Sequence, residues 1–210
     1  MRQGSTACVF LLATQTWSQH HWSQHKAAFL LRVLESLTDQ LATLGVPLQI
    51  LDAPNFDDAP GHLLKFSREI GAKKLFFNRE YPLDENVRDE RVHNSLEENG
   101  IECEPHDSFL VFPPNSILKD DGHPYSVFTP FKRKWLSKAE GEGLRSLPCP
   151  RPQQSRVLET KIPGEILSTR ANFGQNLWLG NHKHAGDLLE TFLNGKIDQY
   201  HNERDFPATD

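Results

Sequence analysis

Apolar positions follow two alternating patterns along the first half of the chain. Short, mainly apolar runs of strand length occupy residues 7–13, 46–51, 75–77 and 101–103, and the first of them is continuous, as is typical of a strand covered on both faces. Between them, leucines and other apolar residues recur every three or four positions, as on the core-facing side of a helix. This alternation predicts an α/β fold: a Rossmann-like parallel sheet with right-handed crossovers and helices on both faces.

The stretch 74–89 is the most informative part of this pattern. A short apolar strand is followed by polar residues, and Pro82 disfavours helix at Tyr81, so a loop is predicted there. Asp84 is expected to cap the next helix, with Glu85 in its first turn. Strand, loop and acidic helix start would place polar side chains at the carboxyl edge of the sheet, where ligands bind in open α/β folds. The alternative is that Asp84 and Glu85 only complement the helix dipole.

Helix boundaries are also indicated by single residues. Ser23 is expected to cap a helix that Gly45 ends, and Asp57 or Asp58 to cap a shorter helix that Gly71 ends. Between the first strand and Ser23, residues 14–22 are polar and aromatic and are predicted to form a loop.

The second half of the chain does not continue this regular alternation of apolar strands and helices. Residues 109–112 resemble one more extended piece, and residues 128–136 a helix with Thr129 as its cap and Pro130 at its first position. Residues 145–163 are rich in Pro, Arg, Gln and Ser, which predicts an irregular linker, and a last helix is expected near residues 184–194.

Composition narrows the class of protein. A net charge of −5 argues against this segment being the main DNA-contacting surface. The three cysteines lie far apart in the sequence without a CxxC pair, which favours a reduced, cytoplasmic setting. No apolar run approaches the ~18 residues of a membrane span, so no membrane association is expected.

Several kinds of chemistry find no support in the sequence. Nucleophile-elbow, P-loop and G-x-G-x-x-G motifs are missing from it. The spacing of its clustered histidines fits no zinc pattern, so we expect no metal site; these histidines are His20, His21, His25, His182 and His184.

A basic stretch beside an aromatic residue is compatible with nucleic-acid binding; it consists of Lys132, Arg133 and Lys134 next to Trp135. A solvated helix face with Trp135 in the core is the simpler interpretation.

Three blocks, in order along the chain, resemble the amino-terminal part of DNA photolyases. They are Phe76-Phe77-Asn78-Arg79-Glu80-Tyr81 with Asp84-Glu85 and Arg88-Asp89; Tyr125-Ser126-Val127-Phe128-Thr129-Pro130-Phe131 with Trp135; and Tyr200 with Arg204-Asp205-Phe206-Pro207.

This resemblance implies a domain organisation. Residues 1–138 would form the α/β antenna-chromophore domain, 139–183 an interdomain linker, and 184–210 the start of the helical flavin-domain region. The family's first strand, which is central in its sheet, has no counterpart in residues 1–6, and the helical domain itself would lie beyond this segment.

The resemblance also implies an activity. The family cleaves cyclobutane pyrimidine dimers in DNA with light and reduced FAD, as a carbon–carbon lyase (deoxyribodipyrimidine photo-lyase). An antenna, methenyltetrahydrofolate or alternatively a deazaflavin, passes excitation energy to the flavin. We expect the full-length protein to be a monomer acting on damaged DNA and this segment alone to be inactive. Two alternatives stay open: a cryptochrome-type light sensor, and a stand-alone pterin- or nucleotide-binding module.

Matched residue by residue, the resemblance assigns site residues. His21, Asp84 and Glu85 fall on the folate antenna site, where Glu85 would accept hydrogen bonds from a pterin ring. Asp84 departs from the Asn that some members carry: an Asn both donates and accepts hydrogen bonds, whereas an ionised Asp only accepts them. A deazaflavin antenna, or none, therefore stays open. Tyr200 falls on a flavin-contacting position and Arg204 on a DNA-backbone contact. No catalytic residue is expected within this segment.

Overall fold

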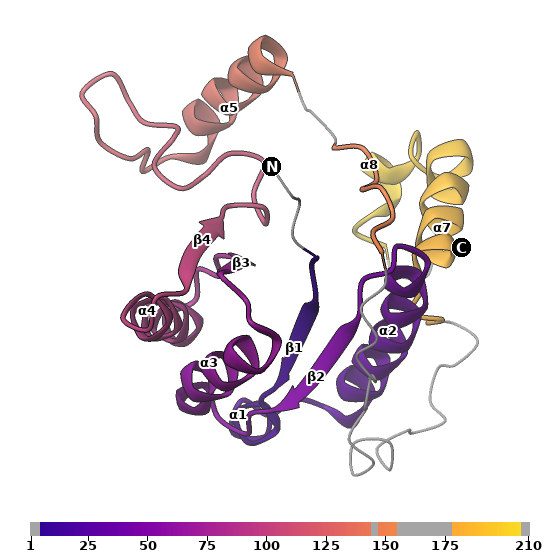
Figure 1. The fold of residues 1–210 in the computed structure, drawn as a ribbon. Helices are drawn as coiled ribbons and strands as arrows, with labels where there is room; N and C mark the ends of the chain where they lie inside the picture. Colours follow the sequence, from indigo (N-terminus) through magenta and orange to yellow (C-terminus); the bar gives the residue numbers. More distant parts are fainter. Residues whose placement is uncertain (1–4, 144–146, 155–177, 207–210) are drawn as a thin grey trace. The chain divides into compact units, whose positions relative to one another are not determined.

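The computed structural model describes residues 5–143, 147–154 and 178–206 (Figure 1). The chain divides into two compact units, one made of residues 1–52 and 151–210 and the other of residues 53–150. Each unit is described by itself.

The first unit is built on a parallel strand pair. Strands β1 (Cys8–Leu12) and β2 (Leu48–Asp52) pair in register from Cys8 opposite Leu48 to Leu12 opposite Asp52. Helix α2 (Gln24–Thr43) connects them. The core of this unit joins both strands to one face of α2, and its members are Leu12, Leu34, Leu48 and Ile50.

The predicted ends of α2 are confirmed. The Ser23 hydroxyl accepts a hydrogen bond from the Lys26 amide at 3.2 Å, which satisfies one of the helix's free N–H groups. Gly45 follows the helix with φ of 68°, in the left-handed region that favours glycine.

Residues 14–22 were predicted to form a loop, and this prediction is wrong for most of them. Thr14–Gln19 form helix α1, in which the Trp17 amide donates to the Ala13 carbonyl at 2.9 Å. The stretch contains no Gly or Pro to interrupt a helix. Thr16 is buried, and the Trp17 and Trp22 rings stack at 4.8 Å, so tertiary packing outweighs the weak helix propensity of Thr, Trp and Ser.

The last part of the first unit packs onto α2. The Arg32 guanidinium donates from Nε to the Trp178 carbonyl at 2.9 Å, and the Trp178 ring meets Phe29 edge-on at 6.4 Å. Gly180, with φ of 70°, lies so close to α2 that a Cβ there would stand 2.9 Å from the Cβ of Arg32. Helices α7 (His182–Gly195) and α8 (Tyr200–Glu203) follow; α7 confirms the last predicted helix.

The second unit repeats the strand–helix–strand pattern. After the short 3-10 helix η1 (Phe56–Asp58) it contains α3 (Ala59–Ile70), β3 (Lys74–Asn78), α4 (Leu83–Glu97) and β4 (Glu102–His106). β3 and β4 are parallel, from Lys74 opposite Glu102 to Asn78 opposite His106. Gly71 ends α3 with φ of 69°, as predicted. The buried apolar residues of these elements, and of the position just before β4, are Ala59, Leu63, Phe66, Val92, Leu96, Ile101 and Cys103.

Two boundaries in the remainder of this unit differ from prediction. Residues 109–112 form bends and not a strand, directly before Pro113 and Pro114. Helix α5 (Phe128–Glu142) begins one residue before the predicted cap Thr129, and Val127 takes the cap position. Trp135 is half-buried and meets Phe112 edge-on at 5.4 Å.

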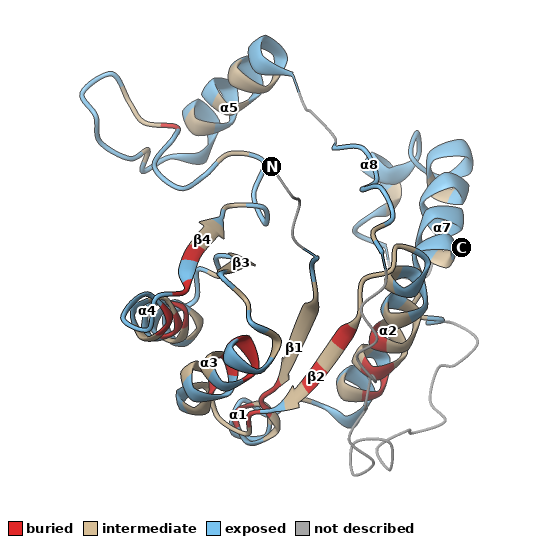
Figure 2. Cartoon of the chain, in the orientation of Figure 1, coloured by how far each residue is buried: buried red, intermediate tan, exposed pale blue. Residues whose placement is uncertain are grey.

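The strands thus form two parallel pairs, and over the described residues no ladder joins one pair to the other. The α/β class with parallel strands and flanking helices is confirmed. Over their described residues, α5 and α7 carry exposed and half-buried side chains and none that is buried, unlike α2, α3 and α4 (Figure 2). No helix in the described part of the chain is long and apolar enough to cross a membrane. The predicted linker, residues 145–163, lies mostly outside the described residues.

Candidate functional site

A polar edge forms where β3 and β4 end in the second unit. Because the strands are parallel, their carboxyl ends lie together, and the Arg79 amide donates to the His106 carbonyl at 2.8 Å. The side chains of Arg79 and Tyr81 both reach Asp107, at 3.1 and 3.0 Å. Desolvation and this bond to Asp107 raise the pKa of the Tyr81 phenol above its ordinary value. The loop after β3 is therefore tied to the end of β4.

A second set of charges holds the same loop to α4. The Arg88 guanidinium donates to Glu80 at 2.6 Å and to Asp89 at 2.7 Å, and the second carboxylate oxygen of Asp89 accepts the Glu80 amide at 3.2 Å. The Arg88 and Asp89 side chains are only 18% and 11% exposed. Burial opposes the Arg88 charge, but the two carboxylates more than compensate and raise its pKa. The Phe56 ring, 4.8 Å from the guanidinium, completes the pocket around Arg88.

Asp84 and Glu85 lie in the first turn of α4, beside this loop. The prediction that Asp84 caps the helix is wrong: Pro82, with φ of −58° and ψ of 153°, is the cap residue, and the helix begins at Leu83. The fixed φ of proline and its extended ψ let Pro82 precede a helix directly. Asp84 is exposed and Glu85 half-buried, and over the described residues no hydrogen bond or ion pair engages the Glu85 carboxylate. Glu85 is thus an available acceptor at a helix start.

His21 lies in the other unit, directly after α1. Its backbone amide donates to the Ser18 carbonyl at 3.1 Å, its side chain is exposed, and its φ is 53°. A positive φ is uncommon outside glycine, although histidine is among the residues that adopt it most readily. Within the second unit Asp84 and Glu85 are neighbours in the first turn of α4, and His21 belongs to the first unit.

The two remaining candidates lie around α8. Tyr200 begins this helix, is 52% exposed, and meets Phe192 edge-on at 5.7 Å. Arg204 follows the helix, is exposed, and holds its Nε 3.8 Å from a carboxylate oxygen of Asp205. Being four residues apart, Tyr200 and Arg204 are also linked by a backbone hydrogen bond of 3.0 Å.

Three features were missed by sequence reasoning. One is the Arg88 network, and another is an apolar groove of about 500 Å³ between α2 and residues 178–188 of the first unit. The third is a cluster of His93, Glu97 and Cys103. A His and a Glu one helical turn apart, followed by a Cys in the next strand, was the signal that would have indicated it.

Two solved structures show which fold this chain shares. A bacterial class III photolyase from Agrobacterium tumefaciens superposes with a TM-score of 0.74 at 23% identity, covering 99% of this chain and 42% of that one. An archaeal photolyase from Sulfolobus tokodaii superposes with a TM-score of 0.61 at 20% identity, covering 80% and 36%. These likenesses show the fold of the amino-terminal region of photolyases.

Sequence comparison is more specific. The sequence model of the DNA photolyase family matches residues 1–153, so the chain belongs to that family. Among curated relatives, the deoxyribodipyrimidine photo-lyase of Vibrio cholerae is 29% identical over 96% of this chain, and the Arabidopsis thaliana cryptochrome-1 is 24% identical over 97%. The chain spans 44% of the first relative's length and 30% of the second's.

Proposed function

We propose that this chain is the antenna-bearing part of a deoxyribodipyrimidine photolyase, which uses light and reduced FAD to split cyclobutane pyrimidine dimers in DNA. Membership of the photolyase family over residues 1–153 carries the proposal. The photo-lyase relatives, matched over nearly the whole chain, agree with it. In this activity the flavin supplies the electron, and the protein binds, orients and tunes the cofactors.

The proposed domains keep the predicted boundaries. Residues 1–138 form the antenna-chromophore domain, 139–183 the linker, and 184–210 the start of the flavin-domain region. The exposed apolar side chains of α7 support assigning it to a further domain, whereas the boundary between residues 138 and 139 falls inside α5. An apolar helix surface at the start of a further domain is one that the rest of that domain would cover.

We place the antenna site at His21, Asp84 and Glu85, with methenyltetrahydrofolate as the ligand. The half-buried Glu85 carboxylate fits a planar ring with adjacent N–H donors, because two carboxylate oxygens accept two such bonds in one plane. Asp84 adds a second acceptor and no donor, which is the reason for keeping a deazaflavin as the alternative ligand. The Sulfolobus tokodaii photolyase was solved with two FAD molecules, which imply a novel light-harvesting cofactor in that protein. An antenna other than a folate is therefore compatible with this fold.

Replacing Glu85 by Gln should weaken binding of methenyltetrahydrofolate by tenfold or more. The change keeps the size of the side chain but removes the charge and one acceptor, and a hydrogen bond to a charged group contributes about 1.5–3 kcal/mol. Fluorescence titration of the purified chain measures the affinity. Glu90→Gln is the matched control, since Glu90 is exposed on the same helix, and it should bind like the unchanged chain. Equal affinities for all three proteins would contradict the site.

Tyr200 and Arg204 are proposed as the flavin and DNA contacts of this segment. Both are exposed side chains on or next to α8. The planar guanidinium of Arg204 offers the paired donors that bind a phosphate, and its weak contact with Asp205 leaves most of these donors available. The net charge of −5 supports placing most of the DNA-binding surface elsewhere in a monomeric full-length protein.

A cryptochrome-type light sensor is the second candidate. The observation that favours it is the similarity to Arabidopsis thaliana cryptochrome-1 over 97% of the chain. A sensor would share the cofactors and signal to a protein partner instead of repairing DNA.

Disrupting the gene that carries this sequence tests the two candidates together. For a photolyase, ultraviolet-irradiated cells should lose their light-dependent recovery, while survival in the dark stays unchanged. Retained light-dependent removal of dimers, measured in extracted DNA, would contradict the repair activity. If the disrupted cells kept light-dependent dimer removal but lost another response to light, the cryptochrome-type sensor would be favoured.

The purified 210-residue chain serves as the control for this experiment. It should leave dimers intact when illuminated with reduced FAD and a dimer-containing oligonucleotide, because it offers one proposed contact to the flavin and one to DNA. Measurable light-dependent loss of dimers would show that the segment holds more of the active site than we propose.

A further inference from the structure

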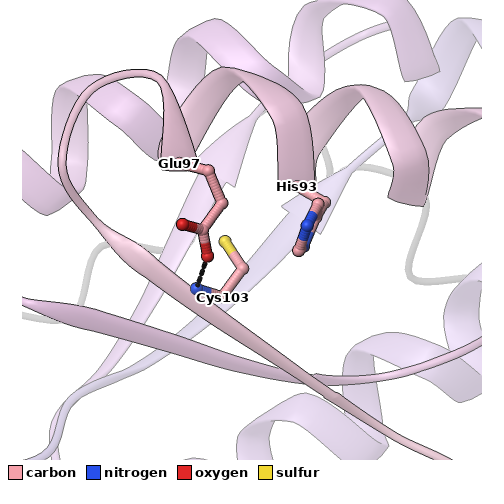
Figure 3. Close-up of side chains that lie close together, drawn as sticks. All are labelled: His93, Glu97 and Cys103. Carbon is pink, nitrogen blue, oxygen red and sulfur yellow. Dashed lines mark hydrogen bonds between the residues drawn. The ribbon is translucent and has the colours of Figure 1, made fainter.

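Three side chains with metal-ligand chemistry converge in the second unit. His93 and Glu97 lie on the second half of α4, and Cys103 lies in β4 (Figure 3). One ligand atom of each, an imidazole nitrogen, a carboxylate oxygen and the thiol sulfur, all lie within 4.8 Å of one another. The three side chains point into the same space between the helix and the strand.

The local fold explains why they meet. Residues four apart on a helix are neighbours on one face, which brings His93 beside Glu97. Successive strand residues alternate between faces: Glu102 and Glu104 both reach Lys74, whereas Cys103 is 9% exposed and faces α4. The helix and strand positions of the three residues therefore bring their side chains together.

A hydrogen bond fixes one member of the cluster. One Glu97 carboxylate oxygen accepts the backbone N–H of Cys103 at 2.6 Å (Figure 3). The other oxygen is left for a further ligand. In metal sites, hydrogen bonds to a ligating carboxylate orient it for the metal.

We propose that His93, Glu97 and Cys103 bind a zinc ion. Thiolate and imidazole are ligands that zinc prefers, carboxylate is a third, and hard cations such as Mg²⁺ and Ca²⁺ avoid thiolate. Three protein ligands leave one tetrahedral position for water. On binding, the thiol proton is released to solvent and the sulfur coordinates as thiolate.

The geometry requires only a small movement. Zinc–ligand bonds of about 2.0–2.3 Å in a tetrahedron place the ligand atoms about 3.3–3.8 Å apart. The present separations, up to 4.8 Å, are wider than these values, so binding requires small movements of the His93 and Glu97 side chains, which are half-buried and exposed respectively.

This site is independent of the proposed antenna site. Glu85 and Glu97 are twelve residues apart on α4, which corresponds to about 18 Å along the helix axis. A zinc ion at the far end would join the last turn of α4 to β4. Binding of zinc is therefore expected whether or not the chain holds an antenna.

Zinc titration of the purified 210-residue chain, in competition with a chromophoric chelator, tests the proposal. We expect one equivalent to bind with micromolar or tighter affinity. His93→Gln, Glu97→Gln and Cys103→Ser should each weaken it at least about tenfold, because even groups outside the ligand set change metal affinity by about 10–100-fold. His123→Gln and Cys149→Ser are matched controls at exposed positions of the same unit and should leave affinity unchanged.

Cobalt substitution supplies a readout that does not depend on the folding of the three ligand variants. Co²⁺ bound to the unchanged chain should show the thiolate-to-metal charge-transfer band and the intense visible bands of a tetrahedral site, and Cys149→Ser should keep both. Failure of the unchanged chain to bind zinc would overturn the proposal. So would a cobalt spectrum without the charge-transfer band, or loss of that band in Cys149→Ser.

Discussion

Replacing Leu96 by Ala should lower the free energy of unfolding of the second unit by about 2–5 kcal/mol. Leu96 is fully buried on α4, at 0% exposure. Truncation removes its apolar contacts and leaves a cavity that the surrounding helices and strands fill only in part. Urea unfolding followed by circular dichroism measures the loss, and hydrogen exchange of the β3 and β4 amides should speed up with it.

Leu83→Ala is the matched control for this change. Leu83 begins the same helix but is 77% exposed, so the same chemical change should shift stability by no more than about 0.5 kcal/mol. Similar losses for Leu83→Ala and Leu96→Ala would show that α4 does not pack as described.

Replacing Arg88 by Gln should lower the free energy of unfolding of the second unit by about 2–4 kcal/mol. The largest structural effect is expected in the loop after β3. Removing one partner from a buried ion pair typically costs about 3–5 kcal/mol, because the remaining charge stays buried without compensation. Here the Asp89 side chain is 11% exposed but Glu80 is 40% exposed, which reduces the expected loss. Urea unfolding measures the total, and hydrogen exchange of the Glu80 amide, which donates to Asp89, reports on the loop.

Arg91→Gln separates this effect from a general loss of charge on α4. Arg91 pairs with Asp57, but the two side chains are 54% and 78% exposed. Exposed ion pairs contribute about 0–1 kcal/mol to stability, so Arg91→Gln should change the free energy of unfolding only slightly. A loss as large as that of Arg88→Gln would mean that burial does not determine the cost.

Much of the fold was predictable because it depends on local signals. Apolar runs and leucine spacing predicted four strands and the main helices, and caps such as Ser23 and Gly71 fixed ends that the structure confirms. Helix α1 was not predictable in this way, because its support comes from the burial of Thr16 and the stacking of Trp17 on Trp22. A window of sequence does not contain those contacts.

The candidate site likewise has a part that follows from local sequence and a part that depends on tertiary contacts. Asp84 and Glu85 are neighbours in the chain, so their common position at a helix start followed from the sequence, although the cap residue proved to be Pro82. The contact of Arg88 with Glu80 spans eight residues and a change from loop to helix. That of Cys103 with Glu97 depends on which face of the strand turns toward α4.

The close approach of Gly180 to α2 has a consequence for ancestry. Any side chain at this position would have to displace Arg32 and the backbone behind it, and the φ of 70° excludes most residues besides glycine. In a related protein with another residue at this position, residues 178–181 cannot pack against α2 as they do in this chain. The residue that a related sequence has at the position of Gly180 therefore indicates whether its residues 178–181 can pack on α2 in the same way.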